Sequence, residues 1–93
     1  MHTTDDQQPS DARLPDGVYD AFVVWVDERD NDMFATDLTV IGGAHKGDVV
    51  CVVAPRDAVC AGLGADRHAD ALDLVGVPCT LHVEHGQPRI ARA

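Results

Sequence analysis

The stretch PRDAVCAGLGADRHADALDL, residues 55–74, decides the fold, because helix-favouring residues gather nowhere else in the chain. Pro55 ends the apolar run before it, since proline cannot donate a hydrogen bond to a sheet. Asp57 predicts the N-cap of a helix over Ala58–Leu63, and Asp66 predicts a second helical segment that ends at Leu74. The sequence on both sides of this stretch has the composition of β-strands.

Five segments outside residues 55–74 favour strands, because valine, isoleucine and aromatic residues are frequent in them and glycine or aspartate separates them. They are Val18–Val26, Met33–Ile41, Asp48–Ala54, Cys79–Glu84 and Arg89–Arg92. Three strands, a helical segment and two strands within about 75 residues is the element order of the OB-fold, a five-stranded Greek-key barrel used mainly for binding. The sequence therefore predicts an all-β domain over residues 17–93, an OB-like barrel with its helix between the third and fourth strands.

The chain is strongly acidic, with 16 acidic and 7 basic residues among 93 and a net charge of −9. Residues 1–16 lack apolar periodicity, and we expect them to form a disordered acidic arm. The rest is acidic too, because residues 17–93 carry 12 acids and 6 bases, a net of −6. This charge counts against tight non-specific binding of nucleic acid, which depends on Lys and Arg at phosphates. Since the sequence shows neither a signal peptide nor a membrane span, we expect a cytoplasmic protein.

Alternation along the first strand places Tyr19, Ala21, Val23 and Trp25 on one face, which we expect to be the core face. The other predicted core positions are Phe34, Thr36, Leu38, Val40, Val50, Val52, Leu63, Leu72, Leu74, Leu81 and Val83. A second set of apolar side chains then has no place in the core: Phe22, Val24, Val26, Val49, Cys51 and Val53. An exposed apolar patch usually marks an interface. We expect self-association or a protein partner there, unless the helical segment or the arm covers the patch.

Several short motifs resemble those of small phage and bacterial OB-like proteins. They are a G-x-Y-x-A strand at 17–21, a G-x-x-K-G hairpin at 43–47, an L-x-G-x-P piece at 74–78 and a G-x-P-R piece at 86–89. The resemblance spans roughly residues 16–92. It implies an OB-like fold and an accessory role in handling single-stranded DNA during replication or recombination.

Binding of single-stranded DNA requires cations for phosphates and exposed rings on which bases stack. The candidate cations are Arg29 in the first turn, His45 and Lys46 in the hairpin after the second strand, Arg56, and Arg89 beside the last turn. Phe22 or Trp25 would supply the stacking ring. So few cations predict weak binding with a shallow dependence on salt.

No set of residues for catalysis or metal binding stands out in the sequence. The five histidines and three cysteines have none of the spacings of zinc sites. Cys51, Cys60 and Cys79 lie in apolar or alanine-rich surroundings, which keep a thiol protonated and inert. We therefore expect a protein that is not an enzyme and that uses neither metal nor cofactor.

Two functions remain open from the sequence. One is a non-catalytic OB-fold binding module that assists in the handling of single-stranded DNA, which the motifs favour. The other is an acidic interaction module that oligomerises or binds a basic partner through its outer strand faces, without contact to nucleic acid, which the net charge favours.

Overall fold

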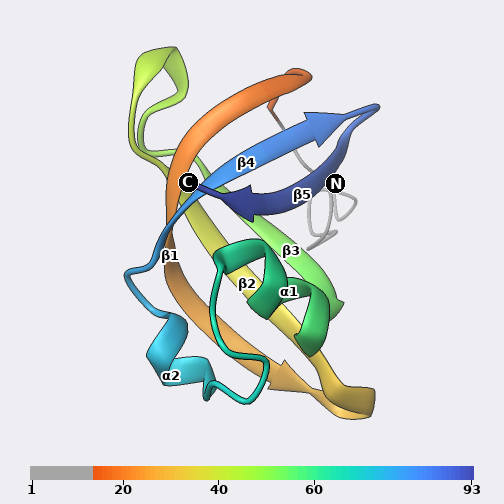
Figure 1. Ribbon diagram of the computed structural model, residues 1–93. Coiled ribbons are helices and arrows are strands. Elements are labelled where there is room, and N and C mark those ends of the chain that lie inside the picture. Colours follow the sequence, from red (N-terminus) through yellow and green to blue (C-terminus); the bar gives the residue numbers. More distant parts are fainter. Residues whose placement is uncertain (1–13) are drawn as a thin grey trace, which may run out of the picture.

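Five antiparallel strands curl into a half-barrel in the computed structural model, which describes residues 14–93 (Figure 1). In chain order the elements are β1 (Gly17–Arg29), the 3-10 turn η2 (Asp30–Asp32), β2 (Met33–Val40), the 3-10 turn η3 (Gly43–His45), β3 (Val49–Pro55), α1 (Arg56–Leu63), α2 (Ala71–Leu74), β4 (Pro78–Glu84) and β5 (Gln87–Arg92). The strand order in the sheet is β3-β2-β1-β4-β5. The prediction of a mainly β domain with five strands is confirmed.

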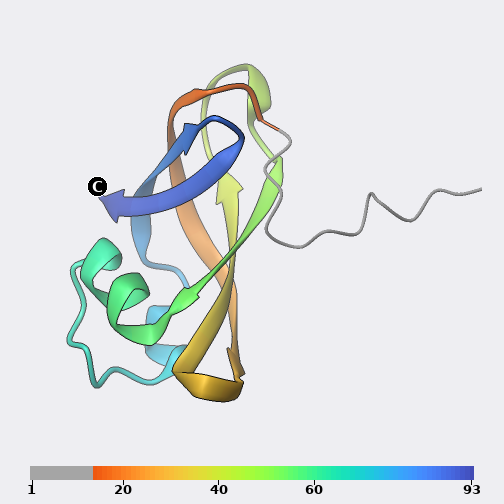
Figure 2. The same ribbon diagram turned by 90° about the vertical axis from the view of Figure 1, so that its right-hand side faces the viewer.

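β1 is the longest strand and lies at the centre of the sheet. Residues 17–22 pair with β4, and residues 21–29 pair with β2. Val23 lies opposite Leu38 and Trp25 lies opposite Asp37, so that Val24 is an extra residue, a β-bulge. A bulge bends its strand, and Figure 2 shows β1 curving between its two partners.

The bulge changes which side chains of β1 reach the core. Ala21 and Val23 are buried, as alternation predicts. Beyond Val24, however, Val26 is buried at 5% exposure, and Trp25 is 47% exposed. The assignments of Trp25 to the core and of Val26 to the outer patch are therefore wrong, because one inserted residue shifts every later side chain to the other face.

The core predicted from the later segments is largely confirmed. The buried residues are Phe34, Thr36, Leu38, Val40, Val50, Val52, Leu63, Leu74, Leu81 and Val83. Leu72 is the exception, with 71% of its surface exposed. α2 is a single turn of four residues, and positions two apart on a helix point in different directions, so that Leu74 packs inward and Leu72 does not.

The structured domain extends further toward the N-terminus than the sequence indicates. Leu14 is buried and belongs to the core cluster. The carboxylate of Asp16 accepts hydrogen bonds from the backbone N–H groups of His85 at 2.9 Å and Gly86 at 3.2 Å, in the β4–β5 turn. Residues 1–13, the rest of the predicted arm, lie outside the described residues.

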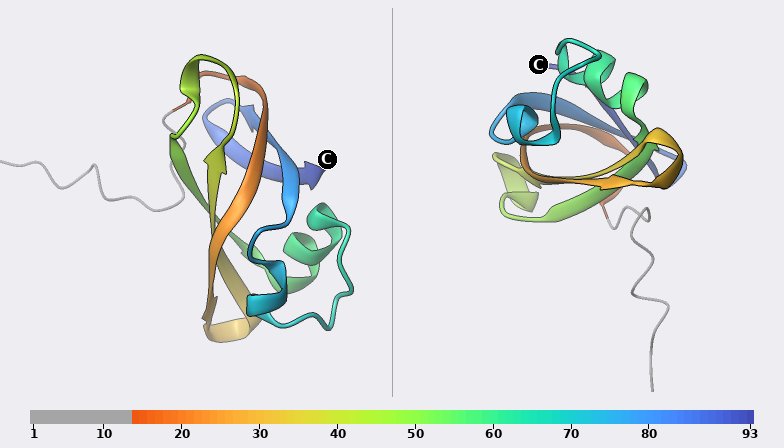
Figure 3. Two further views of the ribbon diagram at one scale, coloured as in Figure 1. Left: turned by 90° about the vertical axis from the view of Figure 1, so that its left-hand side faces the viewer. Right: turned by 90° about the horizontal axis from the view of Figure 1, so that it is seen from below.

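The helices pack on one side of the curled sheet, α1 mainly against β5 and α2 mainly against β1 (Figure 3). The contact between α1 and β5 depends on Gly62. A Cβ atom at this position would lie 2.6 Å from the carbonyl oxygen of Ile90, closer than a carbon atom can approach. Glycine therefore lets the helix lie directly on the β5 backbone.

Candidate functional site

The candidate site is the outer face of β1, β2 and β3, on the side of the sheet away from α1 and α2 (Figure 3). Strand pairing sets its rows. Phe22, Thr39 and Val49 form one row, and Trp25, Asp37 and Cys51 form the next. Asp27, Ala35 and Val53 form a third. We use the term outer face for these three rows together with Asp20 and Val24, which are exposed residues of β1.

Large apolar side chains are exposed on the outer face. Trp25 is the sole tryptophan of the chain and is about half exposed, and Val49 is 61% exposed. Phe22 and Val24 are exposed on β1 close to Trp25, and Val49 lies in the row of Phe22, with Thr39 of β2 between them. Single exposed apolar residues are ordinary on proteins, but several large ones on one sheet face are typical of an interaction surface.

Carboxylates lie beside the exposed aromatic rings. The indole N–H of Trp25 donates a hydrogen bond to Oδ1 of Asp27 at 3.0 Å. Asp37 is the cross-strand neighbour of Trp25, and such neighbours have their Cβ atoms about 5 Å apart. Asp20 lies two residues before Phe22 on the same strand, and therefore on the same face. The aromatic part of the outer face is thus bordered by negative charge.

The surroundings of Cys51 on the outer face favour its protonated thiol. Burial, together with the hydrogen bond to Asp37 and the charge of that carboxylate, raises the pKa of the Cys51 thiol to about 11. Burial likewise raises the pKa of Cys79 to about 11, and it raises the pKa of Cys60. A thiol that stays protonated at neutral pH is a poor nucleophile.

The cations that the sequence suggested for nucleic-acid binding lie in separate places. Arg29 is at the end of β1, next to the β1–β2 turn, whereas His45 and Lys46 are at the β2–β3 connection, at the opposite end of β2 (Figure 1). The eight residues of β2 separate these two turns by about 25 Å at the usual rise of a strand. Arg89 is on β5, outside the outer face. Of the proposed nucleic-acid contacts, Phe22 and Trp25 lie together, and Arg29 lies on the same face of β1 two residues after Asp27, close enough to Cys51 for its charge to lower the pKa of that thiol.

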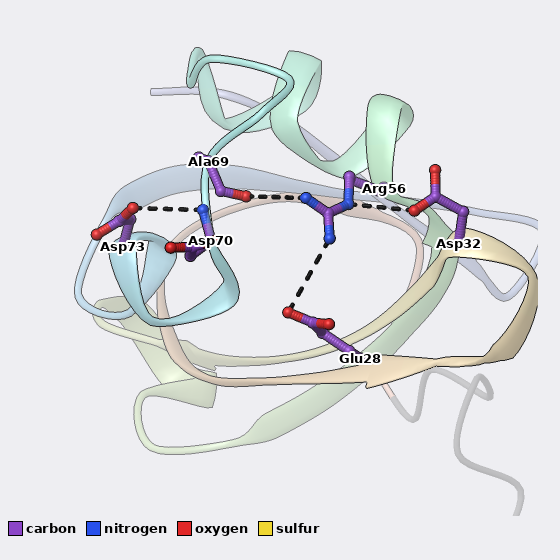
Figure 4. A network of polar contacts seen from close by, with 6 residues as sticks. All are labelled: Glu28, Asp32, Arg56, Ala69, Asp70 and Asp73. Carbon is purple, nitrogen blue, oxygen red and sulfur yellow. Dashed lines mark hydrogen bonds and ion pairs between the residues drawn. The ribbon is translucent and has the colours of Figure 1, made fainter.

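Arg56 is held by the protein itself (Figure 4). Its guanidinium carbon lies 4.8 Å from the centre of the Phe34 ring. Nη1 donates a hydrogen bond to the carbonyl of Ala69 at 3.3 Å, and Nη2 lies 4.0 Å from Oε2 of Glu28. Nε lies 3.2 Å from Oδ1 of Asp32, in an ion pair that lacks the geometry of a hydrogen bond. Arg56 therefore joins the β1–β2 turn to the segment between the helices.

His45 is also engaged within the domain. Its Nδ1 lies 3.2 Å from Oδ2 of Asp48, and its ring packs edge-on against Tyr19 at a centroid distance of 5.9 Å. The Tyr19 hydroxyl in turn donates a hydrogen bond to the carbonyl of Pro15. These contacts hold the β2–β3 connection against the beginning of β1.

A groove of about 460 Å³ lies between β3 and β5, the two edge strands of the sheet. Its lining is mostly apolar, with polar side chains near the β4–β5 turn: Val52, Val53, Ala54, Ala58, Val59, Pro88 and Ile90, then Glu84, His85, Gln87 and Arg89. The sequence analysis missed this groove, because the strand pattern does not show that the sheet curls until its two edges face each other. Of the site residues predicted from the sequence, Arg89 and Val53 line it.

Within residues 14–93, no group of three or more His, Cys, Asp and Glu residues is arranged to hold a metal ion. None of the helices described there has the length and apolar character needed to cross a membrane. Comparisons of the chain with protein families, with curated proteins and with solved structures found no match. The function is therefore argued from the outer face itself.

Proposed function

We propose that this chain is a non-catalytic, OB-like binding module that binds a protein partner through its outer face. The observation that carries the proposal is the exposed Trp25, which lies among apolar neighbours with Asp27 and Asp37 beside it. Tryptophan is among the residues most often responsible for affinity at protein interfaces. A large exposed ring within an apolar patch therefore favours a protein-binding surface.

The arrangement of the strands supports the OB-like part of the proposal. A long, bent β1 pairs with both β2 and β4, so that one strand belongs to both halves of the sheet. The helices lie between β3 and β4 in the chain, as they do in OB-folds. β3 and β5 face each other across the groove without pairing, which corresponds to the partly open barrel of that fold.

Charge favours a protein partner over single-stranded DNA. Stacking of one base on an aromatic ring stabilises a complex by about 1–3 kcal/mol. A phosphate about 6 Å from a carboxylate is repelled by about 1–3 kcal/mol, depending on its exposure to solvent. Asp27 and Asp37 both lie beside Trp25, so that this repulsion offsets the gain from stacking.

Single-stranded DNA handling is the second candidate, and one observation favours it. Phe22 and Trp25 are two exposed rings on the same face of an OB-like sheet, and Arg29 lies on the same strand. This candidate requires bases to stack on the rings while the phosphates run toward Arg29 and away from Asp37.

A selection from a random peptide library, with the full chain as the target, tests the proposed function. We expect enriched peptides whose affinity falls at least about tenfold in Trp25→Ser, which corresponds to about 1.4 kcal/mol. Leu72→Ser is the matched control, because Leu72 is an exposed apolar residue on α2, away from the outer face. Peptides that bind Trp25→Ser as well as the unchanged chain would contradict the proposal.

Titration of the chain with labelled oligo-dT at low salt tests the second candidate. The fluorescence of Trp25, the sole tryptophan, reports directly on the outer face. We expect no change up to about 100 μM, a concentration at which weak non-specific binders register. A saturating change that disappears in Arg29→Glu would favour single-stranded DNA instead.

A further inference from the structure

Beside the β1–β2 turn, a partly buried arginine contacts an aromatic ring and two exposed carboxylates. The Arg56 guanidinium lies over Phe34, and the carboxylates of Asp32 and Glu28 lie 3.2 and 4.0 Å from its nitrogen atoms. Cation–π attraction and charge pairing act together in such an arrangement. The surroundings of the other aromatic rings in the domain can be compared with this arrangement.

Trp25 also has two carboxylates beside it, but no arginine of the described residues lies over its ring. Asp27 is hydrogen-bonded to the indole, and Asp37 is its cross-strand neighbour. Tryptophan attracts cations more strongly than phenylalanine does. Among residues 14–93, the cation–π contact that is present is that of Arg56 with Phe34, and no cation lies over Trp25.

The exposed part of Trp25 is the part that suits a cation. Its indole N–H already has an acceptor in Asp27, so that a ligand has no need to supply one. About half of the residue remains exposed, and apart from its one nitrogen the indole consists of aromatic carbon. A ligand that contacts it gains most from cation–π attraction and apolar contact.

Charge selects the kind of partner. The outer face carries three carboxylates, Asp20, Asp27 and Asp37, with one cation, Arg29, at its end on β1, and the whole chain has a net charge of −9. Pairing of two copies through this face would bring these carboxylates together, and like charges in apposition are unfavourable. A basic segment of another protein has the complementary charge and is attracted from a distance.

We propose that the outer face takes a basic segment of a partner protein, with an arginine or lysine of that segment over the Trp25 indole and beside Asp27 and Asp37. Apolar side chains of the same segment lie on Phe22 and Val49, which are exposed in the adjacent row. This inference rests on the proposed function, because it assigns the chemistry of the partner at the same face.

Three synthetic peptides of equal length test the inference, with leucine alternating with arginine, glutamine or glutamate. Each carries a fluorescent label, and anisotropy is measured with the full chain. We expect the Leu-Arg peptide to bind at least about tenfold more tightly than the Leu-Gln peptide, and the Leu-Glu peptide to bind least. Equal binding of the Leu-Arg and Leu-Gln peptides would overturn the inference and leave the proposed function standing.

Isosteric variants separate a local effect from the general attraction of an acidic protein. Asp27→Asn with Asp37→Asn removes two charges and retains side-chain oxygens that accept hydrogen bonds. The matched control is Asp57→Asn with Glu84→Gln, which removes two charges from exposed positions on α1 and β4. We expect the first pair to weaken the Leu-Arg peptide about tenfold or more, and the control pair to weaken it less than about twofold.

The remaining outcomes are also decisive. Equal weakening by both pairs would mean that only net charge attracts the peptide, and it would overturn the inference. Trp25→Leu should remove the preference for arginine over glutamine while some binding of the leucine side chains remains. If the library selection yields no peptide and none of the three synthetic peptides binds, the proposed function and the inference both fall.

Discussion

Phe34 and Trp25 show how one protein uses aromatic rings in two ways. Phe34 is buried beneath Arg56, and the guanidinium of Arg56 lies close to the carboxylates of Asp32 and Glu28 (Figure 4). Trp25 lies on the opposite side of the sheet, has carboxylates beside it, and is about half exposed. The first ring belongs to the core, and the second is the ring at which we propose that a partner binds.

The difference arises from where each ring lies in the sheet. Phe34 is on β2, where strict alternation points it at the core beneath α1. Trp25 follows the bulge at Val24 and therefore points outward. The comparison teaches that the bulge, rather than residue type, determines which aromatic ring is available for binding.

The largest expected difference in the free energy of unfolding is that between truncation of Phe34 and truncation of Trp25. Phe34→Ala should lower the free energy of unfolding by about 3–5 kcal/mol, because it removes a buried ring and its contact with Arg56. Trp25→Ala should change it by less than about 1 kcal/mol, since half of that side chain is already in water. Urea denaturation measures both, and Phe34→Leu provides a milder variant if Phe34→Ala does not fold. Equal losses from the two rings would break the comparison.

Gly62→Ala tests the packing of the helix that carries Arg56. The new methyl group would meet the carbonyl oxygen of Ile90 at 2.6 Å, so that α1 must move away from β5. We expect a loss of about 1–3 kcal/mol, although alanine favours a helix by about 1 kcal/mol over glycine. Ala61→Gly, at an exposed neighbouring position, should cost only about 1 kcal/mol by helix propensity. A stabilised Gly62→Ala variant in thermal denaturation would show that α1 does not lie so closely on β5.

Arg56→Gln removes the cation that lies over Phe34 between Asp32 and Glu28. The ring then has carboxylates near it but no cation from the part of the chain that the structure describes, as is the case for Trp25. We expect the free energy of unfolding to fall by about 1–2 kcal/mol, because the partners Asp32 and Glu28 are largely exposed and solvent screens their charges. The β1–β2 turn should exchange its amide hydrogens faster, since Arg56 joins it to Ala69. Arg67→Gln, at an exposed position between α1 and α2, is the control. Unchanged exchange in the turn would show that Arg56 does not hold it.

The smallest expected effect is a change in the pKa of Cys51, which is sensitive to the charge of Asp37 on the outer face. The pKa of this thiol, about 11, is raised from 9.0 by burial and then by Asp37. Because the folded protein favours the protonated thiol, this contribution to stability is complete below about pH 9 and is lost as the pH rises toward 11. Asp37→Asn should therefore lower the pKa and accelerate alkylation of Cys51 at mildly alkaline pH.

Mass spectrometry of the alkylated protein measures this rate for each cysteine. Cys60 and Cys79 are buried and serve as internal controls whose rates should not change. Equal acceleration at all three cysteines would indicate a loosened fold. No acceleration at Cys51 would show that the carboxylate of Asp37 does not act at this face.

The strand pattern predicted much of the fold but little of the site. The pairing of β2 with β3 has no bulge, so that Phe34, Leu38, Val50 and Val52 could be assigned to the core correctly. The first and third strands carry apolar residues on both faces, which predicted an exposed apolar patch. Phe22, Val24 and Val49 of that patch are indeed exposed. Arg56 appeared to be a possible phosphate contact, because sequence does not show that Phe34, Asp32 and Glu28 surround it.

The sequence by itself determined the number of strands, the acidic charge and the place of the helical stretch, because composition, alternation and turn residues are local properties. Only the tertiary structure decided the face of Trp25, the partners of Arg56 and the burial of Leu14. Each of these depends on contacts between segments far apart in the chain. A bulge, in particular, is defined by the register with the neighbouring strand, and a strand read alone has no register.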